Sequence, residues 1–114
     1  MKTDYITSSS TLPSCLAYPW FLLGMNVRLV AKEVYAIMLD MTLNSEANVQ
    51  TDSHGRRYLA FLNKTIAELI DRTPSTVAQS LRELEDAGLV EKKLVARNAP
   101  YHVYVKLPAA EDKL

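Results

Sequence analysis

Four polar side chains in residues 75–82 are spaced so that they could contact nucleic acid from one helix. They are Ser75, Thr76, Gln79 and Arg82. At about 100° per residue, Ser75, Gln79 and Arg82 point to one side of a helix, and Thr76 lies beside them. The Gln79 amide can pair with adenine through two hydrogen bonds, Arg82 can reach guanine or phosphate, and hydroxyls suit either target. The pattern favours base recognition in a DNA major groove, and an ordinary solvated helix face is the alternative.

Four further cations lie outside this face, where they could bind the phosphate backbone. Lys64 begins an expected helix, and Lys92, Lys93 and Arg97 fall on or near an expected hairpin. Phosphate contacts position a protein on DNA without reading its sequence. A solvated hairpin edge, where lysine opposes aggregation, is the alternative for the three hairpin residues.

Charge is unevenly distributed along the chain, although the formal net charge is zero. Residues 56–106 hold nine Lys and Arg against six Asp and Glu, whereas residues 1–55 hold three against five. A local basic region is what contact with phosphate requires. Because Glu83, Glu85 and Asp86 directly follow the polar face, we expect them to confine DNA contact to the first two turns of the helix.

The helix that carries the polar face has clear ends and an apolar opposite side. Thr73 is a suitable N-cap, Pro74 suits the first helical position because its missing N–H would be unpaired there, and Gly88 suits the end. The expected recognition helix therefore covers about residues 74–87. Its apolar side, which we expect to face the core, consists of Val77, Leu81 and Leu84.

The elements around this helix are typical of a winged helix-turn-helix. A second helix is expected over Lys64–Asp71 with Asn63 as its N-cap, and it ends about three residues before the recognition helix, a spacing that forces the two to cross steeply. A strand is expected over Arg57–Phe61. Two more strands, Leu89–Val95 and Tyr101–Leu107, would form the hairpin that makes the wing. The predicted fold class is mainly α with a small antiparallel sheet.

The strongest helix signal lies over residues 28–45. Val34, Ile37, Met38 and Met41 recur at the spacing i, i+3, i+4 and i+7, and a second apolar stripe lies beside them. An apolar face this wide indicates burial on more than one side. The helix is therefore expected either at the centre of the fold or also in a dimer interface.

The chain divides into one domain with short segments at both ends. Residues 1–17 are expected to form a flexible or extended arm, residues 18–108 the winged-helix domain, and residues 109–114 a short tail. The apolar segment 18–23 is expected to be extended, on the core or on a partner chain. Trp20 within it is expected to pack against apolar groups rather than to stack on single-stranded bases.

Composition argues against several other function classes. Cys15 is the single cysteine, and His54 and His102 lie far apart in sequence, so we expect no disulfide and no metal site. We find no nucleophile–base pair, phosphate-binding loop or paired-carboxylate motif. The apolar run 12–25 is too short to span a bilayer and lacks the basic start of a signal peptide. We therefore expect a cytoplasmic protein that is not an enzyme and uses no cofactor.

Several segments between Tyr18 and Pro108, about four-fifths of the chain, carry a resemblance to a known family. On these segments the sequence resembles the N-terminal domain of the replication initiator protein A family, which occurs on plasmids and mobile elements of Gram-positive bacteria. The segments are Tyr18–Leu23, Ala31–Asp40, Asp52–Tyr58, Ser75–Val77, Leu84–Lys93 and Tyr104–Pro108.

The resemblance implies a winged helix that forms a homodimer and binds repeated origin sites on double-stranded DNA. Initiators of the family continue into a C-terminal region, through which replication proteins would be bound. Two alternatives stay open: a winged-helix transcriptional regulator, and a protein-interaction module without DNA affinity. The zero net charge favours the last of these.

Overall fold

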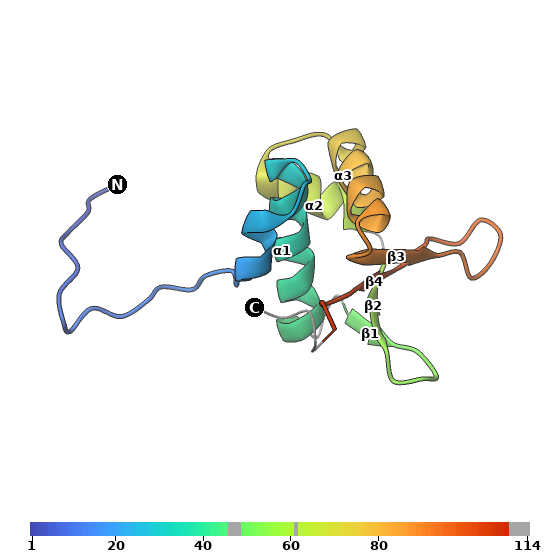
Figure 1. Ribbon diagram of the computed structural model, residues 1–114, viewed down its shortest axis with the longest axis horizontal. Helices are drawn as coiled ribbons and strands as arrows, with labels where there is room; N and C mark the ends of the chain where they lie inside the picture. Colours follow the sequence, from blue (N-terminus) through green and yellow to red (C-terminus); the bar gives the residue numbers. More distant parts are fainter. Residues whose placement is uncertain (46–48, 61, 110–114) are drawn as a thin grey trace.

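An antiparallel sheet of four strands carries α1 and α3 on one face, and α2 packs against α3 (Figure 1). The computed structural model describes residues 1–45, 49–60 and 62–109. The elements in chain order are η1 (Trp20–Gly24), α1 (Leu29–Asn44), β1 (Val49–Thr51), β2 (Arg57–Leu59), α2 (Leu62–Ile70), α3 (Pro74–Asp86), β3 (Val90–Lys93) and β4 (His102–Val105).

The helix α1 lies at the centre of the molecule. It packs against α3 on one side and against β2 and β4 on the other, so side chains around most of its circumference, such as Val34 and Met38, are buried. Tyr35 is fully buried, and its hydroxyl donates to the Lys106 carbonyl at 2.6 Å. This burial raises the pKa of Tyr35 to about 12. The helix expected over residues 28–45 is confirmed, and its wide apolar face reflects a central position.

The turn between α2 and α3 is short and uses one left-handed residue. Asp71 has φ 55°, and the N–H of Arg72 donates to the Ala67 carbonyl at 2.9 Å, which ends α2. The predicted start of α2 is wrong, because the helix begins at Leu62 and Asn63 lies inside it rather than at the N-cap. The earlier start places the Leu62 side chain in the core, where it is buried.

Both predicted ends of α3 are confirmed. The Thr73 hydroxyl accepts the N–H of Thr76 at 3.3 Å, and Pro74 is the first helical residue. Gly88 follows the helix with φ 81°, a conformation that glycine adopts without a Cβ clash. The expected apolar side is buried throughout, and it consists of Val77, Leu81 and Leu84.

The sheet has the strand order β1-β2-β4-β3, with every neighbouring pair antiparallel. The hairpin of β3 and β4 is the predicted wing. Alternation along β4 turns Val103 toward the helices and His102 and Tyr104 toward the other side of the sheet. With α2 and α3 as the helix-turn-helix and this hairpin beside them, the fold is a winged helix-turn-helix.

The strand β1 is an addition to the predicted elements. It pairs with β2, with Val49 opposite Leu59, in a region for which no strand was predicted. Its three residues alternate too briefly to signal a strand by themselves, and pairing with β2 stabilises it. The strand expected over residues 57–61 is shorter than predicted and ends at Leu59, and Phe61 lies outside the described residues.

The segment over residues 18–23 differs from its prediction. It enters the 3-10 helix η1 rather than running extended, because the N–H of Leu22 donates to the Pro19 carbonyl and that of Met25 donates to the Leu22 carbonyl. Leu22 is the side chain of η1 that is fully buried. Trp20 does not pack on the core of its own chain, because 80% of it is exposed. Its packing on a partner chain, the other expected placement, stays a prediction.

The chain before η1 leads away from the body of the molecule (Figure 1). Every residue from 1 to 18 is exposed, including the apolar side chains of Tyr5, Ile6 and Leu12. Among the described residues, no helix has the length and apolar character needed to cross a membrane.

Candidate nucleic-acid interface

The outward face of α3 is open to solvent along its length. Ser75, Gln79 and Arg82 are all exposed, on the side opposite the buried Val77 and its apolar neighbours. Within the described part of the chain, no hydrogen bond or ion pair engages the Gln79 or Arg82 side chain. These two side chains therefore keep their full hydrogen-bonding capacity for a ligand outside the molecule.

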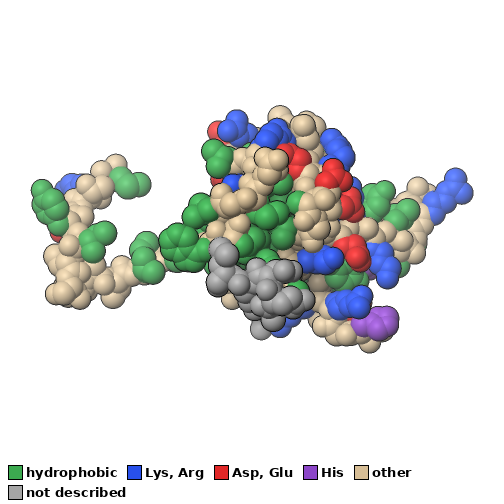
Figure 2. All heavy atoms as spheres, viewed as in Figure 1, with side chains coloured by type: hydrophobic (Ala, Val, Ile, Leu, Met, Phe, Trp, Pro, Cys, Tyr) green, Lys and Arg blue, Asp and Glu red, His purple; other side chains and the backbone are tan. Residues whose placement is uncertain are grey.

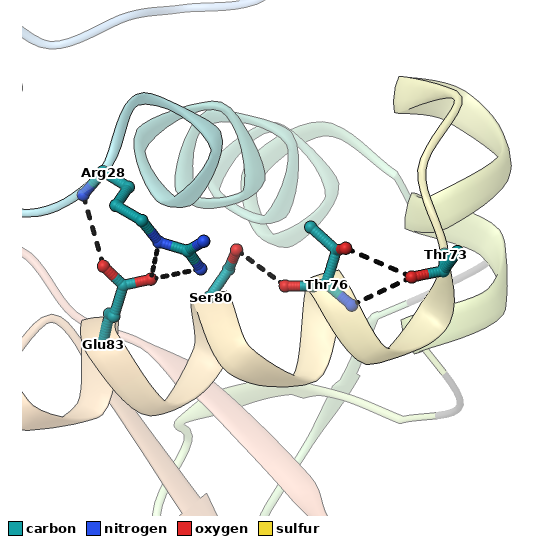
Figure 3. Close-up of polar contacts among 5 residues, drawn as sticks. All are labelled: Arg28, Thr73, Thr76, Ser80 and Glu83. Atoms are coloured by element: carbon teal, nitrogen blue, oxygen red, sulfur yellow. Dashed lines mark hydrogen bonds and ion pairs between the residues drawn. The ribbon is translucent and has the colours of Figure 1, made fainter.

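The hydroxyls at the start of α3 form a small cluster. The Thr73 hydroxyl oxygen lies 3.1 Å from both the Ser75 and the Thr76 hydroxyl oxygens, and Figure 3 shows the contact with Thr76. Thr76 is half-buried, and its carbonyl accepts the Ser80 hydroxyl at 2.9 Å. Ser75 and Thr76 are thus oriented by the cap. Thr73 is also exposed at this end of the helix. The sequence identified it only as an N-cap, so it is an additional candidate for contact with a ligand.

Of the three acidic residues near the end of α3, Glu83 is paired with a cation. Its carboxylate accepts from the Arg28 guanidinium at 2.6 and 2.7 Å and from the Arg28 backbone N–H at 3.3 Å (Figure 3). The hydrogen bond from Arg28 lowers the pKa of Glu83 below its usual value and raises the pKa of Arg28. The pair therefore contributes to stability above the ordinary carboxyl pKa, and this contribution is lost as the pH falls through the lowered pKa.

A second acidic residue, Glu85, is also turned away from the outward face of α3. Its carboxylate accepts the backbone N–H of Lys92 on β3 at 3.2 Å. Of the three acidic residues, Asp86 is exposed and has no such contact within the described part of the chain. The repulsion of phosphate near the end of α3 is therefore weaker than three unpaired carboxylates would produce.

Lys64 and Lys92 meet at one cleft between the start of α2 and the wing. The cleft has a volume of about 450 Å³, and both lysines are among its lining residues. The Lys92 ammonium lies 5.0 Å from the centre of the Tyr101 ring, which holds it over the cleft wall. The other lining residues are Leu62, Asn63, Thr65, Leu81, Pro100 and Val103.

The remaining two predicted cations lie elsewhere. In the wing, Lys92 pairs with Val103, which faces the helices, whereas Lys93 pairs with His102, which faces the other side of the sheet. Arg97 is exposed in the loop of the wing. Because side chains alternate along a strand, the neighbours Lys92 and Lys93 point to opposite faces and cannot hold the same segment of a ligand.

Figure 2 shows how the side-chain types are distributed on one face of the molecule. Hydrophobic side chains occur along the N-terminal arm and on the part of the body that adjoins it. Lys and Arg side chains lie mainly over the helix-turn-helix and the two hairpins, with Asp and Glu side chains among them. The charged part of this face is therefore mixed in sign.

Known proteins resemble the chain in fold and in sequence. A solved structure described as the N-terminal domain of a DNA binding protein has a TM-score of 0.67 and 21% sequence identity, covering 98% of this chain and 89% of that one. At this identity, the likeness concerns the fold alone. No curated protein matches the chain. The family described as the replication initiator protein A N-terminus matches residues 24–113. The chain therefore belongs to the replication initiator protein A N-terminus family.

Proposed function

We propose that the chain binds double-stranded DNA at specific sequences and acts in the replication initiation of a plasmid or mobile element. The observation that carries this proposal is the outward face of α3, where Gln79 and Arg82 are exposed without intramolecular partners. In a helix-turn-helix, the N-terminal part of the second helix enters the major groove. Membership of the replication initiator family supports the replication context.

Each group on this face has a distinct proposed role. Gln79 donates to and accepts from the edge of an adenine, and Arg82 reaches a guanine or a phosphate. Ser75 and Thr76, at the start of α3, bind a backbone phosphate through their hydroxyls together with the N–H of Ser75, where the helix dipole also favours an anion.

The backbone contacts extend from α3 onto the neighbouring cleft and wing. Lys64 and Lys92 line the same cleft, so both can bind phosphates of one strand that runs past α2. Arg97 reaches the backbone or the minor groove from the tip of the wing. These contacts provide affinity without sequence preference, whereas the side chains of α3 provide the preference.

Gln79→Ala is expected to relax sequence preference. A specific duplex is first selected from a random pool, and its affinity is then compared with that of a scrambled duplex of equal length. Loss of a two-hydrogen-bond contact to adenine should weaken the specific complex by about 1–3 kcal/mol, or roughly 5- to 150-fold. The scrambled duplex should be nearly unaffected. Equal losses on both duplexes would show that Gln79 does not read bases.

A protein-interaction module without DNA affinity is the second candidate function. The exposed apolar arm and the zero net charge favour it. Binding to a panel of random and repeat-containing duplexes at low salt separates the candidates. Binding that weakens as salt rises supports DNA binding, and an absence of binding to every duplex at low salt supports the module. A transcriptional regulator would bind DNA but would select sites in promoters rather than origin repeats.

We further propose that two copies associate through the N-terminal arm. Apolar side chains of the arm, such as Ile6 and Leu12, are exposed, and on the body Trp20, Leu23 and Leu29 are exposed as well. Large exposed apolar areas often mark surfaces that bind another protein. A second copy that exchanges its arm would cover both surfaces at once.

Removal of residues 1–17 is expected to convert a dimer into a monomer. The arm makes no helix or strand in the described structure, so the far-ultraviolet circular dichroism of the winged-helix body should be retained. Sedimentation equilibrium of the full chain and of the shortened chain measures the change in mass. An unchanged oligomer mass after removal of the arm would contradict this role.

A further inference from the structure

The outer face of the sheet carries a group of aromatic rings, of which Tyr58 and His102 are partly exposed and Tyr104 is buried. The helices α1 and α3 contact the opposite face. On the outer face, the rings of Tyr58 and His102 stack with centres 3.9 Å apart and planes 13° apart. The ring of Tyr104 lies 5.6 Å from that of Tyr58. A solvent-facing side of an antiparallel sheet usually carries separate polar side chains, so a packed ring cluster requires an explanation.

Hydrogen bonds hold these rings in place. The Tyr58 hydroxyl donates to the Gln50 side-chain oxygen at 2.8 Å, and the Tyr104 hydroxyl donates to the Asp52 carboxylate at 2.9 Å. Asp52 is itself fixed, because it accepts the backbone N–H groups of Arg56 and His54 at 2.9 and 2.8 Å, and the first of these is the main cause of its lowered pKa. The cluster is thus ordered before any ligand arrives.

Cations border the ring cluster at both ends. Lys93 lies directly opposite His102 on the neighbouring strand. At the other end, Arg56 and Lys106 line a cleft of about 530 Å³ together with Tyr104 and Glu91. Lys93, Arg56 and Lys106 outnumber the two carboxylates near the cluster, Glu91 and Asp52, and the Asp52 carboxylate already accepts the Tyr104 hydroxyl, so the balance along this face is positive.

The composition of the outer face fits nucleic acid better than a protein partner. The strand residues directed to it are Gln50, Tyr58, Glu91, Lys93, His102 and Tyr104. They include no aliphatic side chain, whereas protein interfaces have an apolar centre from which charged residues are depleted. Rings flanked by Lys and Arg are the combination that binds single strands, through base stacking and backbone attraction.

We propose that the outer face of the sheet binds single-stranded nucleic acid, with a base stacked on the Tyr58–His102 pair and Lys93 on the adjoining phosphate. A duplex does not fit this face, because its bases are already stacked on each other and present no free ring surface. The surface is independent of the duplex interface on α3. Lys92 and Lys93 serve the two surfaces separately, since they point to opposite faces of β3.

The test measures binding of a fluorescent 20-nucleotide oligothymidine, and of a duplex of equal length, at low salt by anisotropy. His102→Ala is expected to weaken oligothymidine binding roughly 5- to 150-fold, the effect of one lost base stack. Lys93→Ala should weaken it as well and reduce its salt slope by about 0.7. Lys92→Ala, the matched control one residue away, should leave oligothymidine binding unchanged while weakening duplex binding.

A conservative substitution guards against loss of the fold. His102→Phe keeps a ring against Tyr58 and should retain oligothymidine binding, and the exposed Lys93 can be replaced without disturbing packing. The proposal is overturned if the chain does not bind oligothymidine at low salt. It is also overturned if His102→Ala and Lys93→Ala both bind oligothymidine like the unmodified chain. Loss of duplex binding in Gln79→Ala bears only on the α3 interface, so the two proposals can fail separately.

Discussion

Leu84→Ala is expected to lower the free energy of unfolding by about 2–5 kcal/mol. Leu84 is fully buried in the core cluster and lies on the side of α3 that packs against α1. Truncation loses the free energy of transferring the side chain out of water and leaves a cavity in the core. The Leu84 carbonyl accepts the N–H of Leu89 at 2.9 Å, and this bond limits how far the end of α3 can move to fill the cavity. Since the same contact orients the outward face of α3, DNA affinity should fall with stability.

Urea unfolding followed by circular dichroism measures this effect, with Leu84→Met as the matched control. Methionine has a similar volume and should cost less than about 1.5 kcal/mol. A second control, Arg82→Ala, changes an exposed residue of the same helix and should have little effect on stability. A loss below about 1 kcal/mol in Leu84→Ala would show that α3 is not anchored through this side chain.

The double variant Lys64→Ala/Lys92→Ala is expected to weaken binding to every duplex by a similar factor. The logarithm of the binding constant falls linearly with the logarithm of the salt concentration. If the two ammonium groups each neutralise one phosphate, the magnitude of this slope should decrease by about 1.8 in the double variant. If the variant and the unmodified chain bind equally at 1 M salt, this difference in slope makes the variant bind roughly 60-fold more weakly at 0.1 M salt. Sequence preference should be retained, because neither lysine lies on the outward face of α3.

Affinity measured on specific and scrambled duplexes at several salt concentrations tests this expectation. The control is Lys64→Ala/Lys93→Ala, which removes the same charge from the chain but only one cation from the cleft. Its salt slope on duplex DNA should fall by about 0.9. Equal slopes for the two double variants would show that total charge, rather than the cleft between α2 and the wing, determines backbone binding.

The sequence alone was enough to predict the elements whose signals are local. The limits of α3 follow from Thr73, Pro74 and Gly88, each of which acts through its own backbone conformation or through a hydrogen bond within one turn. The outward direction of Gln79 and Arg82 follows from helical periodicity, since the buried side of α3 is recognisable within the same segment. The wing was also predictable, because alternation along β4 distinguishes its two faces over a few residues.

Other features depended on contacts between segments that are distant in the chain. Glu83 is paired because α1 brings Arg28 to it across 55 positions, and Lys64 and Lys92 share a cleft because α2 lies beside the wing. No local pattern encodes either approach. The same reason explains why the strand β1 was not predicted, since it forms only by pairing with β2. It also explains why the exposure of Trp20 was not predicted, since apolar character alone does not show which surface covers a side chain.

The sequence by itself thus determined which side chains could meet a ligand, since residue type and periodicity are properties of the segment. Only the tertiary structure decided which of them act together. It placed Lys92 in one cleft with Lys64, and it assembled Tyr58 with His102 and Tyr104 into one cluster. Pairing of β2 with β4 brings Tyr58 beside two rings that lie far from it in the sequence, and the position of α2 beside the wing brings Lys64 to Lys92. Neither approach is a property of a single segment.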